Sequence, residues 1–425
     1  MISIKSIPLS EAIELVIDYR GKTPKKLGGD WSTSGYRALS AKNIKTGSIV
    51  QPETIRYVDE DLYKKWMKDE VQKGDIFITS EAPFGQIYYW DSDEKIVLSQ
   101  RIFALRTKKE FCSKYLYYYM TTPEFQAELD ARATGTTVIG LRQPELLKCK
   151  IKYPPLEVQR KIAGVLSALD DKIELNNKIN NNLEQQAQAL FLNIISANDF
   201  DNKLLSEIAL IKYGKGLPTN KLTKTGYKVF GGNGIIGYYT DYLYKDPQIL
   251  ISCRGAASGT ILVSHPYSYV TNNSLIIELK DRRYFEFLKQ YFTLNQLHSY
   301  ATGSAQPQIT IDNLKTVEVP YPDYKIISNM SECFASISNK IYKNICENEK
   351  LAQLRDTLLP KLMSGEIDVS KVNISADKLS FIVLFIQSDQ PEVTSDQPGK
   401  NGPHYNPCVY WGLGYTRPAR IFLFR

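Results

Sequence analysis

One glycine-rich motif has the spacing of a dinucleotide-binding turn. Residues Gly232–Gly237 read Gly-Asn-Gly-Ile-Ile-Gly. Such a turn binds a pyrophosphate when a strand precedes it, a helix opens on it and an acid follows about 20 residues later. Here Tyr238–Tyr242 favours extended structure, and Ala256 and Ala257 stand where the acid is needed. We therefore interpret the motif as a turn whose glycines allow a close approach of backbone or ligand.

Other patterns that would indicate catalysis are missing from the sequence. The six cysteines form no Cys-x-x-Cys pair and have no histidine at zinc-ligand spacing, so we expect no metal site. His265, His298 and His404 are scattered, and we interpret each as an ordinary histidine rather than a general base. No Walker-type phosphate loop and no nuclease-like acidic pair followed by lysine occur. The sequence predicts a chain with no catalytic residue and no cofactor of its own.

Polar and basic stretches with interleaved aromatic residues are the remaining candidates for function. Arginine reads guanine, and asparagine or glutamine reads adenine, through paired hydrogen bonds in the major groove, whereas lysine mostly neutralises phosphate. We therefore predict DNA contacts in both halves of the chain, although a solvated surface position is the commoner alternative for any single residue. The candidates are Arg20, Lys22, Lys25, Lys26, Lys42, Asn43, Ser80, Arg101, Thr136, Thr137 and Arg142 in the first half, and Lys215, Lys221, Asn233, Arg254, Asn272, Asn273, Gln306 and Gln308 in the second.

The composition of the 425 residues permits this interpretation without requiring it. Lys and Arg number 53 against 46 Asp and Glu, a net charge of +7 that allows a polyanionic partner. Hydrophobic residues make up 43% and charged residues 23%, as in globular proteins, which excludes global disorder. The longest apolar run, Leu379–Ile386, is far shorter than a membrane span, and residues 1–20 have no apolar core of a signal peptide. We expect a cytoplasmic chain with reduced cysteines and no membrane contact.

A duplication organises the chain. Ala133–Gly135 recurs as Ala301–Gly303, and the same offset of 168 residues relates Tyr153 to Tyr321 and continues without a gap for about sixty residues. Upstream the offset is larger, so the first copy carries about 26 extra residues in its middle. Each copy therefore reads as a globular part followed by a helix.

The globular parts read as mixed and rich in strands. Gly74–Thr79 is typical of a turn that leads into a strand, and Gln248–Ser252 is its counterpart. One amphipathic helix is predicted in each part, near Lys114–Met120 and near Tyr284–Leu294.

A heptad pattern follows Pro154 and Pro155 and predicts a long helix. Its repeat, 168 residues later, has no helix-breaking residue before Pro360. The predicted seam positions are Ile162, Leu169, Asn176, Leu183 and Leu190 with Leu166, Ile173, Asn180, Ala187 and Ile194 in the first helix, and Met330, Ile337, Asn344, Leu351 and Leu358 with Phe334, Ile341, Asn348, Arg355 and Leu362 in the second.

Four seam positions carry asparagine, two in each helix near its midpoint: Asn176, Asn180, Asn344 and Asn348. An unpaired amide on an apolar seam is costly, whereas facing amides fix helix register. The midpoints coincide in an antiparallel pair and also in an unstaggered parallel one. Because the chain must travel out along one helix and return along the other, we predict an antiparallel pair about 50 Å long.

These observations predict an α+β protein with two mixed, strand-rich domains separated by a long antiparallel two-helix coiled coil and related by an internal pseudo-twofold duplication. The predicted limits are 1–155 for the first domain, 156–197 for the first helix, 198–322 for the second domain and 323–372 for the second helix. Residues 373–425, with a Pro/Gly/Ser/Asp-rich stretch, stay unassigned because nothing after the first helix corresponds to them.

The helical segments resemble a known family. Pro154–Ile162, followed by Leu169–Glu174, is similar to the central helical region of type I restriction-modification specificity subunits, and so is Leu354–Ile367. The resemblance covers roughly residues 1–372 and is more specific in the helices than in the globular parts. Three features depart from it: Pro322–Tyr324 replaces the Pro-Pro-Leu of the first copy, Arg355 lies on the seam, and residues 373–425 do not fit the family. The first two predict a second helix that is docked or kinked differently.

The resemblance implies a role for each part. Each globular part would be a target recognition domain that reads one half of a bipartite DNA sequence. The helices would set the spacing and dock methyltransferase subunits, and a motor-nuclease subunit would join them for cleavage. S-adenosylmethionine, ATP and Mg would then be bound by these partner subunits and not by this chain.

Two alternatives remain open from the residues. The chain could be a stand-alone methyltransferase or nuclease with a divergent site, which turnover by the isolated chain would reveal. It could instead be a structural coiled-coil protein with protein partners only, which indifference to DNA at low salt would support.

Overall fold

The computed structural model describes residues 3–135, 139–303 and 306–369, without the side chain of residue 329. Thr136, Thr137 and the unassigned segment 373–425 lie outside the described residues. The described chain forms two compact units. Unit 1 contains residues up to Ile173 and from Glu349 onward, and unit 2 contains Glu174–Asn348. The predicted limits at the helix ends differ from this division, because each unit includes a segment of both long helices.

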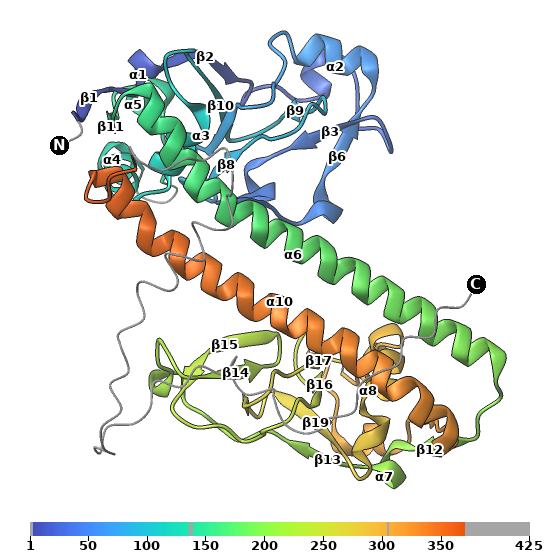
Figure 1. Ribbon diagram of the computed structural model, residues 1–425. Coiled ribbons are helices and arrows are strands. Elements are labelled where there is room, and N and C mark those ends of the chain that lie inside the picture. The colour runs from blue at the N-terminus through green and yellow to red at the C-terminus, as the bar shows by residue number, and fades with distance from the viewer. Residues whose placement is uncertain (1–2, 136–138, 304–305, 370–425) are drawn as a thin grey trace, which may run out of the picture. The chain divides into compact units, whose positions relative to one another are not determined.

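Unit 1 is built around a four-stranded sheet in the order β2-β10-β7-β8, with a three-stranded sheet, β6-β3-β9, beside it in the same unit (Figure 1). All four residues of β7 are buried, as expected of an inner strand covered on both faces. The strands are β1 (Lys5–Pro8), β2 (Ile13–Asp18), β3 (Tyr36–Leu39), β4 (Ile44–Lys45), β5 (Ser48–Ile49), β6 (Arg56–Val58), β7 (Ile76–Thr79), β8 (Ile87–Tyr89), β9 (Val97–Leu98), β10 (Ile102–Thr107) and β11 (Lys150–Tyr153). The helices are α1 (Leu9–Ala12), α2 (Glu60–Trp66), α3 (Ser113–Met120), α4 (Pro123–Arg132) and α5 (Gln143–Leu147).

Unit 2 repeats this topology. Its sheets have the orders β13-β19-β16-β17 and β15-β14-β18, and in each unit the smaller sheet contains one parallel pair. The strands are β12 (Asn202–Leu204), β13 (Ala209–Tyr213), β14 (Tyr227–Gly231), β15 (Gly234–Tyr239), β16 (Ile249–Ser252), β17 (Ile261–Val263), β18 (Tyr269–Val270), β19 (Ser274–Leu279) and β20 (Glu318–Pro320), and the helices are α7 (Leu205–Ile208), α8 (Phe285–Leu294) and α9 (Ile311–Lys315). The predicted duplication is confirmed, and so are the strands at β7 and β16 and the helices α3 and α8.

The two long helices are α6 (Leu156–Ala197) and α10 (Tyr324–Ser364), drawn in green and orange in Figure 1. Pro360 does not end α10, which continues through Ser364. The helix ends instead at Gly365, whose left-handed φ of 77° is typical of a glycine that closes a helix.

One predicted seam position on α6 is wrong. Leu190 is 42% exposed, whereas its neighbour Phe191 is 2% exposed and belongs to the core of unit 2. A straight α-helix has 3.6 residues per turn and drifts by about 20° per heptad from a strict seven-residue repeat. At Leu190, four heptads after Ile162, that drift has moved the buried face by one residue.

The asparagines of unit 2 meet as antiparallel packing requires. Asn176 Nδ2 donates to Asn348 Oδ1 over 2.9 Å, and Asn344 Nδ2 donates to Asn180 Oδ1 over 2.7 Å. The order of these pairs along α6 and α10 is antiparallel, as predicted. In unit 1, Arg355 leaves the apolar layer, and its Nη1 donates to Asp170 Oδ1 over 2.8 Å.

Candidate nucleic-acid interface

In unit 1, several predicted contact residues lie on loops that meet at one end of the central sheet. The amide of Ala41, beside Lys42, donates to the carbonyl of Gln100 over 3.1 Å, and the amide of Ser80 donates to the carbonyl of Arg101 over 2.8 Å. Leu141 N in turn donates to Ser80 O over 3.0 Å. These backbone bonds bring Lys42, Arg101 and Arg142 to the same group of loops, which we call the strand-end loops of unit 1.

An open pocket of about 280 Å³ lies among these loops. Lys42 and Arg101 line it together with Trp31, Arg56 and Gln100. The Arg56 guanidinium lies 5.1 Å from the centre of the Trp31 ring, while Arg101 pairs with Glu81 over 3.2 Å. Three cations and an indole around one hollow suit a phosphate or a stacked base. Trp31 and Arg56 were not among the predicted contacts, because their place at the pocket depends on the pairing of β6 with β3 and not on a local pattern.

The structure contradicts two of the predicted contacts in unit 1. Asn43 is fully buried, and its side chain bonds Ser40 and Thr54 inside the domain. Ser80 is 2% exposed, so its hydroxyl lies beneath the loop surface. A polar residue type does not distinguish an internal cap from a surface contact, which is why the sequence misplaced both.

Four further residues of unit 1 are bound within the protein or lie elsewhere. Arg20 donates to both carboxylate oxygens of Asp18 and stacks on a phenylalanine ring, although its Nη1 also reaches Leu141 O in the strand-end loops. Lys22 Nζ donates to Trp66 O over 2.6 Å, and burial lowers the pKa of its amine. Lys25 and Lys26 are exposed on the segment that follows it. These lysines therefore group with α2, not with the strand-end loops.

In unit 2, more of the predicted DNA-contact residues lie close together. Cys253 N donates to Asn273 O over 3.2 Å, Arg254 forms a β-bridge with Gln308, and Lys215 N donates to Val270 O over 2.9 Å. A side chain at Gly232, next to Asn233, would come within 3.0 Å of Asn273 O. These contacts bring together the strand-end loops of unit 2, with exposed Lys215, Asn233, Arg254, Asn272, Asn273 and Gln308.

Two predicted residues of unit 2 lie at its margins. Lys221 is exposed on the turn Thr219–Lys221, and the following Leu222 packs 3.3 Å from where a side chain at Gly237 would begin. Lys221 therefore lies beside the β14–β15 hairpin. Gln306 is exposed two residues before Gln308, next to residues outside the described range.

The same backbone pattern holds the loops in both units. In unit 1, the backbone of Ser80 forms hydrogen bonds with the backbones of Arg101 and Leu141. In unit 2, the backbone of Cys253 bonds those of Asn273 and Ile309 in the same way, and Ile309 follows Leu141 by the repeat offset of 168 residues. Beneath these loops, the hydroxyls of Ser80, Ser252 and Thr271 are buried and have no hydrogen-bond partner among the described residues. The scaffold is thus shared, while the side chains that it presents differ between the units.

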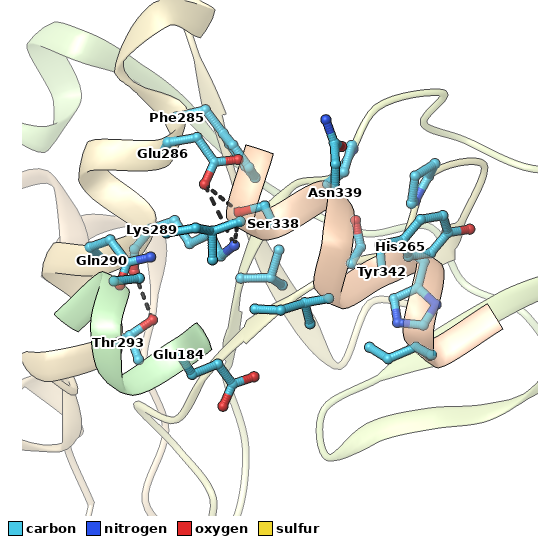
Figure 2. Close-up of a pocket in the computed structure, with 18 of the residues that line it drawn as sticks. Glu184, His265, Phe285, Glu286, Lys289, Gln290, Thr293, Ser338, Asn339 and Tyr342 are labelled. Carbon is cyan, nitrogen blue, oxygen red and sulfur yellow. Dashed lines mark hydrogen bonds and ion pairs between the residues drawn. The ribbon is translucent and has the colours of Figure 1, made fainter. Parts of the chain in front are cut away.

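A cavity of about 360 Å³ lies in unit 2 where α8 packs against segments of α6 and α10 (Figure 2). Ser338 Oγ donates to Glu286 over 2.7 Å and accepts from Lys289 Nζ over 2.6 Å. On the other side of the cavity, burial first and Lys228 second lower the pKa of His265 to about 4. Ser338, Glu286 and Lys289 therefore bond one another beside the cavity, whereas His265 contacts Lys228.

The structure also shows the conformation of the glycine-rich motif. Gly232–Gly237 spans the turn and the first half of β15 in a hairpin, as the extended interpretation predicted. Within the described residues, no group of three or more His, Cys, Asp or Glu side chains is arranged to hold a metal ion. In that same part of the chain, no helix has the apolar 18-residue window that a membrane span requires.

Known proteins resemble this chain over most of its length. The specificity subunit of the type I restriction enzyme MjaIX from Methanocaldococcus jannaschii is 26% identical over 364 residues, which cover 75% of this chain and 83% of that protein. The specificity subunit of the HindI enzyme from Haemophilus influenzae is 25% identical over 411 residues, 71% and 88% of the two chains. The crystal structure of a type I S subunit from M. genitalium shares the fold, with a TM-score of 0.56 at 19% identity, covering 85% of this chain and 96% of that one.

The family assignment follows from the duplicated match. The model of the type I restriction modification DNA specificity domain matches residues 5–185 and again residues 198–351, once for each copy of the repeat. The chain belongs to the family of type I restriction-modification specificity subunits.

Proposed function

We propose that this chain is the DNA reader of a type I restriction-modification complex and performs no chemistry itself. Unit 1 reads one half of a bipartite duplex target, and unit 2 reads the other half. The segments of α6 and α10 set the spacing between the halves and dock methyltransferase subunits, and a motor-nuclease subunit joins the same complex. A cytoplasmic location remains part of this proposal.

The observation that supports the proposal is the gathering of the strand-end loops in each unit. Duplex DNA presents phosphates and base edges together, so its reader needs cations and amides on one surface. Unit 1 offers Lys42, Arg56 and Arg101 around one pocket, and unit 2 offers Lys215, Arg254 and Asn273 on adjoining loops. Two such surfaces in one chain match a target with two halves.

The proposal leaves the cofactors to the partner chains. S-adenosylmethionine would be bound by the methyltransferase subunits, and ATP and Mg by the motor-nuclease subunit. In unit 2, Ser338, Glu286 and Lys289 beside the cavity of about 360 Å³ bond one another, which supports a role for this chain in binding rather than in catalysis.

Long-read methylation mapping of the host genome, with and without this gene, tests the proposal. We expect one bipartite adenine-methylated motif to vanish on deletion and to return on complementation. Exchanging residues 1–153 or 199–321 for those of a relative should then change one half of the motif and keep the other. The matched control is the deletion strain complemented with the unchanged chain.

Two outcomes would contradict the proposal. A motif that persists after deletion, while the methyltransferase partner is expressed, would remove the chain from target reading. Methylation or cleavage of DNA by the isolated chain would make it an enzyme in its own right.

A further inference from the structure

The β14–β15 hairpin of unit 2 contains a bulge that exposes two adjacent isoleucines. Val229 pairs with Gly237 and Phe230 pairs with Ile235, so Ile236 is the extra residue of the described ladder. In a regular strand, successive side chains point to opposite faces, and one of two neighbours is normally covered. Here Ile235 is 46% exposed and Ile236 is 45% exposed. The bulge therefore presents both apolar side chains to the surroundings.

The glycines of the Gly-x-Gly-x-x-Gly motif build this conformation. Gly234 has a φ of 110° and Gly237 has a φ of 153°, which other residues rarely adopt. A side chain at Gly231 would begin only 2.8 Å from Cγ2 of Ile236. The bulge thus requires the glycines of the motif, and the position of Ile236 requires the preceding Gly231. Together these glycines hold the isoleucines in a defined place.

The hairpin belongs to the strand-end surface of unit 2. At its turn, a side chain at Gly232 would meet Asn273 O at 3.0 Å and Ser252 Oγ at 3.2 Å, and Asn233 is exposed next to it. The isoleucines therefore continue the surface that carries Lys215, Arg254 and Asn273. A ligand that binds this surface must offer hydrogen-bond acceptors and negative charge beside an apolar group.

Duplex DNA offers that combination at one base. In the major groove, thymine presents a C5-methyl group next to the O4 acceptor, and the phosphates lie close by. We propose that Ile235 and Ile236 contact a thymine methyl group in the half-site that unit 2 reads. This inference rests on the proposed function of unit 2 as a DNA-reading unit.

Unit 1 carries a different residue at the corresponding edge. The sheet order β6-β3-β9 corresponds to β15-β14-β18, and β6 begins with exposed Arg56 instead of an apolar pair. Arg56 pairs in register with Ala38, as Gly237 of unit 2 pairs with Val229, and the preceding Ile55 is buried. The apolar contact is therefore specific to unit 2, and the two halves of the target are read by different chemistry at this edge.

Binding of the full-length chain, in complex with its methyltransferase partner, to synthetic duplexes tests the inference. The duplexes carry the mapped target with each thymine of the second half-site replaced in turn by deoxyuridine, which lacks only the methyl group. We expect one replacement to weaken binding about fourfold, the effect of one buried methyl group. I235A or I236A should weaken binding to the thymine duplex at least as much and make that deoxyuridine replacement silent.

Controls separate the contact from other effects. L210A removes a leucine on β13 that is more exposed than either isoleucine, at 57%, and should leave binding and the response to deoxyuridine unchanged. Deoxyuridine in the first half-site should act equally on all variants. Both isoleucines are half exposed, so we expect their alanine variants to fold and assemble normally.

Three results would overturn the inference. A second half-site without thymine, or wild-type binding that ignores every deoxyuridine replacement there, excludes a methyl contact. Equal losses on thymine and deoxyuridine duplexes for I235A and I236A assign the isoleucines another DNA contact. Impaired assembly with the partner at unchanged DNA affinity makes them a protein-docking site. Failure of the wild-type complex to prefer its target at all would instead refute the proposed function.

Discussion

The packing of the short helix on the long helices differs between the two units. In unit 1, Tyr118 of α3 is 3% exposed, and its hydroxyl donates to Asp170 over 2.6 Å. The guanidinium of Arg355 donates to the same carboxylate. The aromatic ring and the ion pair thus fill this junction of α3, α6 and α10.

In unit 2, the equivalent junction is hollow. At the repeat offset of 168 residues, Ser338 stands for Asp170 and Ala187 stands for Arg355, and both line the cavity of Figure 2. From α8, Gln290 is 7% exposed and lines the same cavity. Loss of the ion pair and of the large ring therefore accounts for the open space.

The comparison shows which features of the duplication are constrained. Both units keep the strand order, the backbone bonds of the strand-end loops and the antiparallel helix segments. At the junction, the Asp170–Arg355 ion pair of unit 1 is replaced in unit 2 by a cavity, beside which Ser338 bonds Glu286 and Lys289. In unit 2 the alignment of the helix segments then rests on paired amides, while in unit 1 it rests on one ion pair.

The largest expected difference concerns the central side chain of each junction. Y118A in unit 1 removes a buried ring and one donor to Asp170, and should lower the free energy of unfolding by about 3–5 kcal/mol. Q290A in unit 2 removes a side chain that borders an existing cavity, and should cost about 1 kcal/mol. Hydrogen exchange measured by mass spectrometry assigns the loss to α3 or α8. Equal losses would show that the cavity does not distinguish the junctions.

The second prediction concerns the loss of stability of unit 2 at low pH. The folded pKa of His265 is about 4, below its ordinary value of 6.5, because burial and Lys228 disfavour the imidazolium. As the pH falls, the imidazole is therefore protonated in the unfolded chain before it is protonated in the folded chain. The contribution of neutral His265 to the free energy of unfolding is complete above about pH 6.5 and is lost as the pH falls towards 4. The shift corresponds to a loss of about 3 kcal/mol at most.

The matched variant for this prediction is H265Q. Its stability should change less than that of the wild-type chain between pH 7 and pH 4.5, and the difference should be confined to unit 2, because unit 1 contains no histidine. Hydrogen exchange of peptides from both units provides the measurement. An identical pH dependence of the two proteins would place the His265 imidazole in contact with solvent.

Much of the architecture could be predicted because it depends on periodic patterns. The repeat offset predicted two copies, and the heptads with their asparagines predicted an antiparallel pair, which the bonds of Asn176 and Asn344 confirm. Local periodicity could not predict where a straight helix leaves the heptad, so Leu190 was misplaced. Nor could it show that Pro360 lies within the last turns of α10.

The candidate interface was less predictable, since it depends on contacts between distant segments. Arg254 and Gln308 are brought together by a bridge between loops, which no local pattern encodes. Arg56 joins Lys42 and Arg101 at one pocket, in a strand that pairs with β3, which no local pattern shows. Asn43 is of a residue type that often contacts bases, but its side chain caps an internal turn through hydrogen bonds with Ser40 and Thr54.

The third prediction tests whether the amides of unit 2 align its helix segments. N344L leaves the buried amide of Asn180 without its donor and should cost about 1–3 kcal/mol. The double variant N180L/N344L replaces both amides by apolar groups, and should recover most of this loss. Thermal unfolding of the four proteins gives the coupling energy. Additive losses would mean that the two amides stabilise the helices independently and do not act as a register pair.

The smallest expected effect comes from transplanting the ion pair of unit 1 into unit 2. S338D alone places a second carboxylate beside Glu286, which now accepts from the Ser338 hydroxyl, with Lys289 as the one cation among the described residues that contacts both. The variant should therefore destabilise unit 2. A187R supplies the missing guanidinium from α6 and fills part of the cavity. The double variant A187R/S338D should therefore be more stable than the sum of the two single changes predicts, by about 1 kcal/mol. Loss of that coupling in 1 M NaCl would identify it as electrostatic. Its absence at low salt would mean that the two units place their helix segments differently at this junction, despite the shared repeat offset.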